Sequence, residues 1–335
     1  MKTPILLFCL GFTQACLAEQ MPEPDPPYAV QDQPRPSIPR KKLAVTGPQE
    51  WTFHKTADGT HPSNAEQNIV WLMNRARQNP AAEGAFLADS GDANIASAID
   101  FFNVDVDQLQ AEFSSYSSQP PAAFDVRLYR AALAHSRDLI ARDSQDHNNQ
   151  FERVDRAGFS YRYIGGNVFA YADSSLDCHA AWNIDWGFEA DGMQTGRGHR
   201  VNLMSLREGN TLSNVGIAAV RDNDINTSVG PWVVTGNYAE ANVASPNHFN
   251  RFIVGTVWRD KNHNARYDSG EGLGNVKVRP RGGAYWAKTA KSGGYAVPIT
   301  AAGSYSVGFS GGPLETSQAL PVTVGNDSVL LDLVL

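Results

Sequence analysis

The most informative segment of this chain begins at Asp146-His147 and ends at Gly198-His199-Arg200-Val201-Asn202-Leu203-Met204. Its two histidines stand 52 positions apart (199 − 147), which is too far for one local ligand motif. Only a tertiary fold can bring them together. Between them lie Arg153, Ala157-Gly158-Phe159, Gly165-Gly166-Asn167-Val168 and Trp182-Asn183-Ile184-Asp185-Trp186.

Helical patterns come before strand patterns in this part of the chain. Ser63 and Glu66 form a capping-box pattern at the start of the first expected helix, and Asp125 is placed to cap a later one. The expected helices cover 63–78, 95–113, 125–139 and 174–186, and the expected strands cover 215–220 and 232–238. Helices followed by strands, without regular alternation, predict an α+β fold rather than a doubly wound sheet.

From Arg251 onward, short β-type runs are divided by Gly, Asn and Pro turns. The runs cover 253–258, 276–279, 285–288, 295–299, 304–309, 320–324 and 329–335. So many short strands in so few residues predict a small all-β sandwich over 250–335. We expect the boundary at Ser245-Pro246-Asn247, so that the first domain covers 63–245.

The order of the motifs resembles the CAP superfamily of cysteine-rich secretory, antigen 5 and pathogenesis-related proteins, in its bacterial form. Gly198-His199-Arg200-Val201-Asn202-Leu203 matches the second histidine motif, and His147 corresponds to the first cleft histidine. The resemblance covers roughly residues 63–240 and implies an α-β-α sandwich. The C-terminal segment resembles the repeat domains of Gram-positive surface adhesins of the Cna-B and SdrD B types.

The CAP resemblance implies a cleft of two histidines and two acids, and this chain departs from that pattern. Gly166 stands in place of one acid, and Asp185 shortens the other. The cleft residues expected here are therefore His147, Asn167, Asp185 and His199. We favour a non-enzymatic protein that binds a small apolar or peptide ligand in this cleft, because such binding needs no nucleophile.

Two alternatives stay open. In the first, His147, His199 and Asp185 hold a zinc ion with an open position for water, and the protein is a secreted metal-dependent peptidase or esterase. In the second, the cleft is vestigial and the protein is a structural adhesion module. His135 and His179 lie on expected helices, and we interpret them as packing residues.

A twelve-residue stretch near the start of the β-rich domain has the spacing of a calcium-binding loop. Oxygen-bearing side chains stand at positions 1, 3, 5, 9 and 12, and a main-chain carbonyl is expected at position 7. The residues are Asp260, Asn262, Asn264, Arg266, Asp268 and Glu271. Ala265 takes position 6, where a glycine normally permits the sharp turn. We favour a structural calcium site over a plain polar turn.

The N-terminus predicts export. Residues 1–18 combine Lys2, a short apolar run and small residues before a cleavage point after Ala18, which is typical of a signal peptide. Residues 19–62 follow as a proline-rich linker. Thr13 stands where a lipobox usually has leucine, so we favour a secreted, extracellular or periplasmic protein over a lipoprotein anchored at Cys16.

Composition narrows the expected partners. Removal of the signal leaves a formal charge of −8 (27 − 35), which argues against nucleic acid as the main partner. No later segment is long and apolar enough to cross a membrane. The remaining partners are the cleft ligand and a cell-surface polymer or protein attached through the β-rich domain. Cys178 would stand alone in the mature chain, which excludes an internal disulfide.

Overall fold

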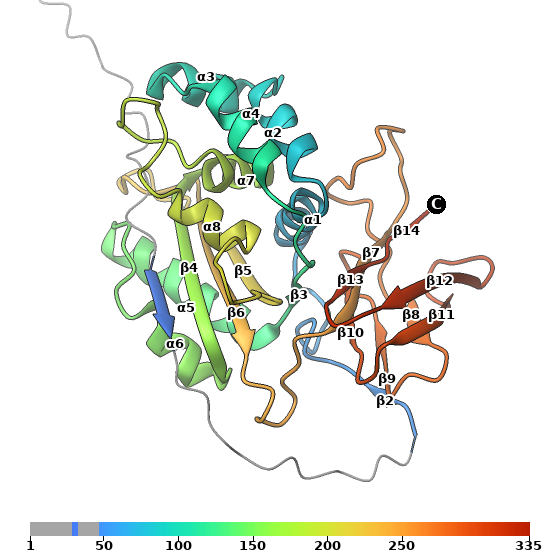
Figure 1. The fold of residues 1–335 in the computed structure, drawn as a ribbon. Coiled ribbons are helices and arrows are strands. Elements are labelled where there is room, and N and C mark those ends of the chain that lie inside the picture. The colour runs from blue at the N-terminus through green and yellow to red at the C-terminus, as the bar shows by residue number, and fades with distance from the viewer. Residues whose placement is uncertain (1–28, 33–46) are drawn as a thin grey trace, which may run out of the picture.

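The computed structural model describes residues 29–32 and 47–335 (Figure 1). The expected signal peptide and most of the expected linker lie outside these residues. The helices are α1 (Asn64–Gln78), α2 (Pro80–Ala88), α3 (Ala93–Phe102), α4 (Val106–Ser115), α5 (Val126–Arg142), α6 (Gln150–Ala157), α7 (Ser175–Ile184) and α8 (Gly198–Met204). The strands before residue 250 are β1 (Ala29–Asp32), β2 (Gln49–Glu50), β3 (Ala123–Phe124), β4 (Tyr161–Ala172), β5 (Asn214–Arg221) and β6 (Trp232–Ala241).

The α+β prediction is confirmed. One sheet has the strand order β1-β4-β6-β5-β3, with α5 and α6 against one face and α1, α7 and α8 against the other (Figure 1). The close approach of α5 to this sheet requires a glycine on β5. A Cβ atom on Gly216 would lie 2.1 Å from the Tyr129 main-chain nitrogen of α5. The largest apolar core runs from Ile69 to Tyr238, and a second cluster, which includes Leu128, Phe151 and Ile164, lies where α5 and α6 meet the sheet.

The helix starts follow the expected capping chemistry, with two differences in where helices break. The Glu66 main-chain N–H donates to Ser63 Oγ at 3.3 Å, and the Ser63 N–H donates to the Glu66 carboxylate at 2.7 Å. Asn79 ends α1 but also caps α2. The helix expected over 95–113 is interrupted at Asn103, which takes a left-handed conformation, so that α3 and α4 form separately.

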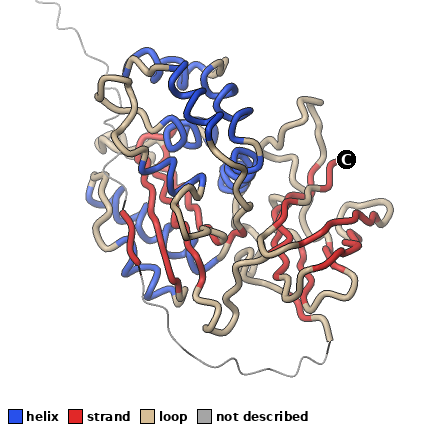
Figure 2. The backbone as a smooth tube through the Cα atoms, viewed as in Figure 1, coloured by secondary structure: helices blue, strands red, loops and turns tan. Residues whose placement is uncertain are grey.

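The C-terminal part of the chain, from β7 onward, is a sandwich of two sheets and contains no helix among the described residues (Figure 2). Its strands are β7 (Phe252–Trp258), β8 (Lys277–Pro280), β9 (Tyr285–Lys288), β10 (Gly294–Pro298), β11 (Gly303–Ser310), β12 (Gln318–Val324), β13 (Val329–Leu330) and β14 (Leu333–Val334). One sheet has the order β10-β7-β13, with β14 also paired to β7, and the other has the order β12-β11-β8-β9-β2. Val278, Val297 and Phe309 belong to the core between them.

Residues 47–62, placed in the linker by the sequence analysis, are packed in the structure. β2 pairs in parallel with β9, and Trp51 is 3% exposed. Trp51 contacts Phe53, Phe249 and Tyr285, which explains its burial. The sequence analysis did not predict this apolar cluster, because two of the partners of Trp51 lie some 200 residues away in the sequence.

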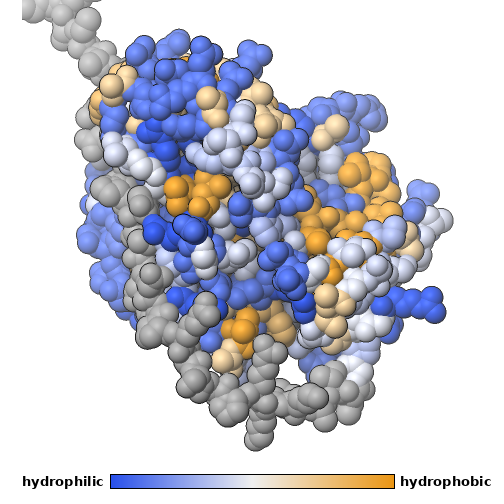
Figure 3. Space-filling model, viewed as in Figure 1, coloured by the Kyte–Doolittle hydropathy of each residue, from blue (hydrophilic) through white to orange (hydrophobic). Residues whose placement is uncertain are grey.

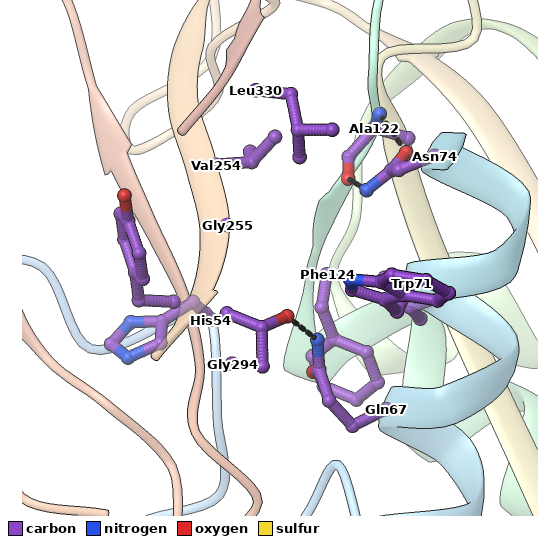
Figure 4. Close-up of a pocket in the computed structure, with 13 residues that line it drawn as sticks. His54, Gln67, Trp71, Asn74, Ala122, Phe124, Val254, Gly255, Gly294 and Leu330 are labelled. Atoms are coloured by element: carbon purple, nitrogen blue, oxygen red, sulfur yellow. Dashed lines mark hydrogen bonds between the residues drawn. The ribbon is translucent and has the colours of Figure 1, made fainter. Parts of the chain in front are cut away.

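The larger α+β part of the chain and the smaller β-rich part meet along α1. Gln67 Nε2 donates to Thr256 Oγ1 at 2.9 Å, and Trp71 Nε1 donates to Asp332 Oδ2 at 3.0 Å. A cavity of about 20 Å³ lies between the halves, with His54 on its rim (Figure 4). This is about the space that one water needs. The interface therefore combines side-chain hydrogen bonds with a small cavity that apolar and polar residues both line.

Candidate functional site

His199 and Asp185 form a buried pair. Asp185 follows the last residue of α7 in a left-handed conformation, and His199 lies in the first turn of α8. Nδ1 of His199 lies 2.7 Å from Asp185 Oδ1, and the His199 main-chain N–H donates to Asp185 Oδ2 at 3.0 Å. A carboxylate can only accept, so Nδ1 carries the proton and Nε2 bears the lone pair in neutral His199.

His147 has a neutral partner in place of an acid. Its Nδ1 lies 2.6 Å from Gln150 Oε1. The Gln150 amide nitrogen donates to Asn237 Oδ1 at 2.9 Å and to the Gly236 carbonyl at 3.3 Å, which fixes the orientation of the amide. His147 must then donate through Nδ1, so it adopts the same neutral tautomer as His199.

Gln150 also explains the departure at Gly166. A Cβ atom on Gly166 would lie 2.5 Å from Gln150 Nε2, so the glutamine amide occupies the space next to the strand that a side chain at 166 would need. Sequence reasoning identified the missing acid but missed this replacement. Gln150 stands three residues after His147, on the following helix, and that spacing was the available signal.

The two histidine clusters meet at β4 from its two faces. Asn167 Nδ2 donates to the His199 carbonyl at 2.9 Å, and Asn202 Nδ2 donates to Asn167 Oδ1 at 3.0 Å. Gly166 precedes Asn167 on β4 and faces Gln150 on the opposite side of the sheet, because successive strand residues point to opposite faces. The structure thus groups Asp185, His199 and Asn167, while His147 belongs to the neighbouring Gln150 cluster.

The expected zinc ligands can be tested against this geometry. Both oxygens of Asp185 bind His199, so Asp185 orients that imidazole rather than offering a free ligand oxygen. Within residues 29–32 and 47–335, no group of three or more His, Cys, Asp and Glu side chains is arranged to hold a metal ion. A mononuclear zinc site with Asp185 as third ligand does not fit this arrangement.

His135 and His179 are packing residues, as expected. Nε2 of His135 lies 2.9 Å from the Asp146 carbonyl, and burial lowers the pKa of His135 to about 4. Nε2 of His179 lies 2.9 Å from Glu83 Oε1 in a fully buried site, where burial also lowers the pKa of His179. Each imidazole has a structural partner within its own layer.

A groove of about 840 Å³ runs beside α8, the helix that carries His199. Its apolar lining includes Tyr116, Met193, Val201 and Leu206. On the face of the molecule drawn in Figure 3, apolar surface lies over the position of α8. The volume lies in the range of small-molecule sites. Sequence reasoning missed this groove, because its walls come from α4, the 189–197 segment and α8, which no motif connects.

The polar wall of the groove is an ion-pair network. Glu112 binds both Arg197 and Arg200. Although burial alone would raise it, hydrogen bonds from Arg197, Gln108 and Arg200 lower the pKa of Glu112 to about 2. Arg200 Nε and Nη2 also donate to the Asn183 and Ile184 carbonyls at the end of α7. This network fixes α8 against α7 and holds the groove wall in place.

The expected calcium loop is folded around its own hydrogen bonds. Asp260 accepts from the Asn264 and Ala265 main-chain N–H groups, at 3.1 and 3.0 Å. Asn262 and Asn264 both direct their amides at Asp268 Oδ2, each at 2.8 Å. Ala265 adopts a φ of 58°, the left-handed conformation that position 6 requires.

Glu271 does not fit the role of a twelfth-position calcium ligand. Its two carboxylate oxygens accept from the Lys261 and Asp268 main-chain N–H groups, each at 2.8 Å. The side chain therefore closes the base of the loop instead of pointing to its centre. Arg266, the position 7 residue, also contacts α2. Its guanidinium carbon lies 4.0 Å from the centroid of the Phe86 ring, so the loop packs against the α+β part of the chain.

Comparison of the chain with protein-family models and with curated proteins gave no match. Among the described helices, none combines the length and apolar character needed to span a membrane.

Proposed function

We propose that this is a secreted, CAP-like binding protein whose α+β part takes a small apolar or peptide ligand in the groove beside α8. The β-rich part serves for attachment to a surface. The groove supports this proposal most directly. It offers an apolar wall from Val201 and Leu206 and a charged rim from Glu112, Glu189, Asp191 and Arg197. An apolar pocket with a few polar groups is typical of a small-molecule site.

The cluster of Asp185, His199 and Asn167 supports a positioning role in this proposal. Asp185 holds His199 and thereby the first turn of α8, and Asn167 joins that turn to β4. Each interaction fixes the helix that forms one groove wall. The burial of these pairs needs no reacting group to explain it, since their donors and acceptors define a buried hydrogen-bond network.

The alternative is a metal-dependent hydrolase, and one observation favours it. His147 and His199 both carry the Nδ1 proton, and neutral imidazoles ligate metals through the unprotonated nitrogen. Asp185 would then act as the carboxylate that orients a metal-binding histidine. This alternative requires a further ligand that the expected set did not include.

Binding of a fluorescent long-chain fatty acid and of 8-anilinonaphthalene-1-sulfonate to residues 47–335 and to the full chain tests the proposal. Val201→Glu places a charge on the apolar wall, and we expect it to weaken probe binding by at least tenfold, since a buried charge costs more than 1.4 kcal/mol. Ile225→Gln is the matched control, because Ile225 is 94% exposed and far from the groove in sequence. Equal binding by both variants, or none by the native chain, would favour the vestigial cleft.

A further inference from the structure

The β-rich half contains a basic segment within an acidic protein. The chain carries a formal charge of −7, yet residues 272–314 contain no Asp or Glu. The Lys and Arg residues of this segment are Lys277, Arg279, Arg281, Lys288 and Lys291. Such a local excess of one charge concentrates oppositely charged partners at that part of the surface. The composition of the whole chain conceals it.

The structure places these cations on one face of a sheet. Val278 and Pro280 of β8 are buried in the sandwich, whereas Arg279 and Arg281 are exposed. Lys277 shares their face, because alternate residues of a strand point the same way. This sheet lies on the side of the sandwich away from the first half of the chain (Figure 1). The face is therefore directed to solvent.

Like charges lie directly opposite one another on this face. Lys277 of β8 is the cross-strand partner of Lys288 of β9. Such a pair destabilises a sheet. Among the described residues no carboxylate forms an ion pair with Lys277, Arg279, Arg281 or Lys288. An anion bound across the strands would relieve this repulsion.

A hollow lies beside the cations. Gly308 of β11 is the partner of both Arg279 and Ala319, so small residues flank the arginine. A Cβ on Gly308 would have only the Arg279 carbonyl within 4 Å, at 3.8 Å. The hollow is about 450 Å³ in volume, and Ser306, Ser310 and Gln318 also line it. It therefore offers hydroxyl and amide groups next to guanidinium groups.

We propose that this face, centred on Lys277, Arg279 and Arg281, binds an anionic polysaccharide. Arginine and lysine recognise carboxylate or sulfate groups, and the serine and glutamine side chains can bond to sugar hydroxyls. Trp286, whose ring centroid lies 4.4 Å from Lys277 Nζ, adds a flat surface for a sugar ring. The single tryptophan does not provide the row of aromatic rings on which single-stranded nucleic acids stack. This inference rests on the proposed role of the β-rich half in surface attachment and specifies its chemistry.

The test measures binding of the full chain to immobilised polygalacturonate, heparin and neutral dextran at several salt concentrations. We expect salt-sensitive binding to one or both of the anionic polymers and none to dextran. The variant K277Q/R279Q/R281Q should bind at least tenfold more weakly. The control R130Q/R137Q/R156Q changes net charge equally, at exposed positions of α5 and α6, and should bind like the native chain.

Several outcomes would overturn the inference. Equal losses in the two triple variants would show that binding follows net charge alone. Tighter binding to single-stranded DNA than to either polysaccharide, or no binding by the native chain, would assign the face another role or none. Probe binding in the α8 groove, measured on the same variants, should stay unchanged. If the native chain binds polysaccharide but no probe in the α8 groove, the proposed groove function is contradicted and the polysaccharide inference stands.

Discussion

His54 makes the interface between the two halves sensitive to acid. The side chain is 1% exposed, and Nε2 lies 2.7 Å from the Lys288 carbonyl of β9. Burial and the charge of Lys55 lower the pKa of His54 from 6.5 to about 4, although the hydrogen bond to Lys288 opposes this. Protonation would place a buried charge beside the small cavity of Figure 4.

The sign of the effect follows from proton binding. Between pH 4 and 6.5 the unfolded chain binds a proton at His54 and the folded chain does not, so the free energy of unfolding rises with pH. The contribution is fully present above pH 6.5 and is lost as pH falls toward 4. The pKa difference corresponds to a loss of about 2 kcal/mol from pH 7 to pH 5 and about 3 kcal/mol by pH 4.

Urea unfolding of the native chain, His54→Gln and His263→Gln at pH 5, 6 and 7 measures this contribution. The glutamine at 54 keeps a donor for the Lys288 carbonyl but does not titrate. We expect the stability advantage of the native chain over His54→Gln to shrink by about 2 kcal/mol from pH 7 to pH 5. His263 is exposed, so its variant should follow the native curve. Parallel pH curves for the native chain and His54→Gln would refute the reasoning.

Three further outcomes are expected. Gly166→Ala should lower the free energy of unfolding in urea by about 1–3 kcal/mol, because the new methyl group displaces the hydrogen-bonded Gln150 amide. In a Gln150→Ala background the same Gly166→Ala substitution should cost much less, because the amide is no longer there to be displaced. His199→Ala should lower the free energy of unfolding in urea, because it leaves the buried Asp185 carboxylate without its imidazole partner; one zinc per native chain, lost in this variant, would support the hydrolase alternative. Asp260→Ala should abolish any calcium-dependent rise in melting temperature, and a rise that survives the substitution would show that calcium binds elsewhere.

Local patterns in the sequence predicted much of the secondary structure. The capping box at Ser63 and Glu66 and the aspartate cap at Asp125 depend on contacts only a few residues apart, and both formed as expected. The α+β class follows from the order of helices and strands, because that order limits the layers that can pack.

Tertiary structure alone decided how the candidate sites are built. The sequence could not show that Gln150 fills the space beside Gly166, that Asp185 gives both oxygens to His199, or that Lys277 faces Lys288 across two strands. It also could not show that residues 47–62 pack against a sheet far along the chain. Each of these contacts joins separate elements, and strand register and helix packing set their geometry. The sequence by itself therefore determined which local elements form and where their polar and apolar faces lie. The folded chain determined which of those faces meet, because contacts between distant residues arise only when the whole core closes.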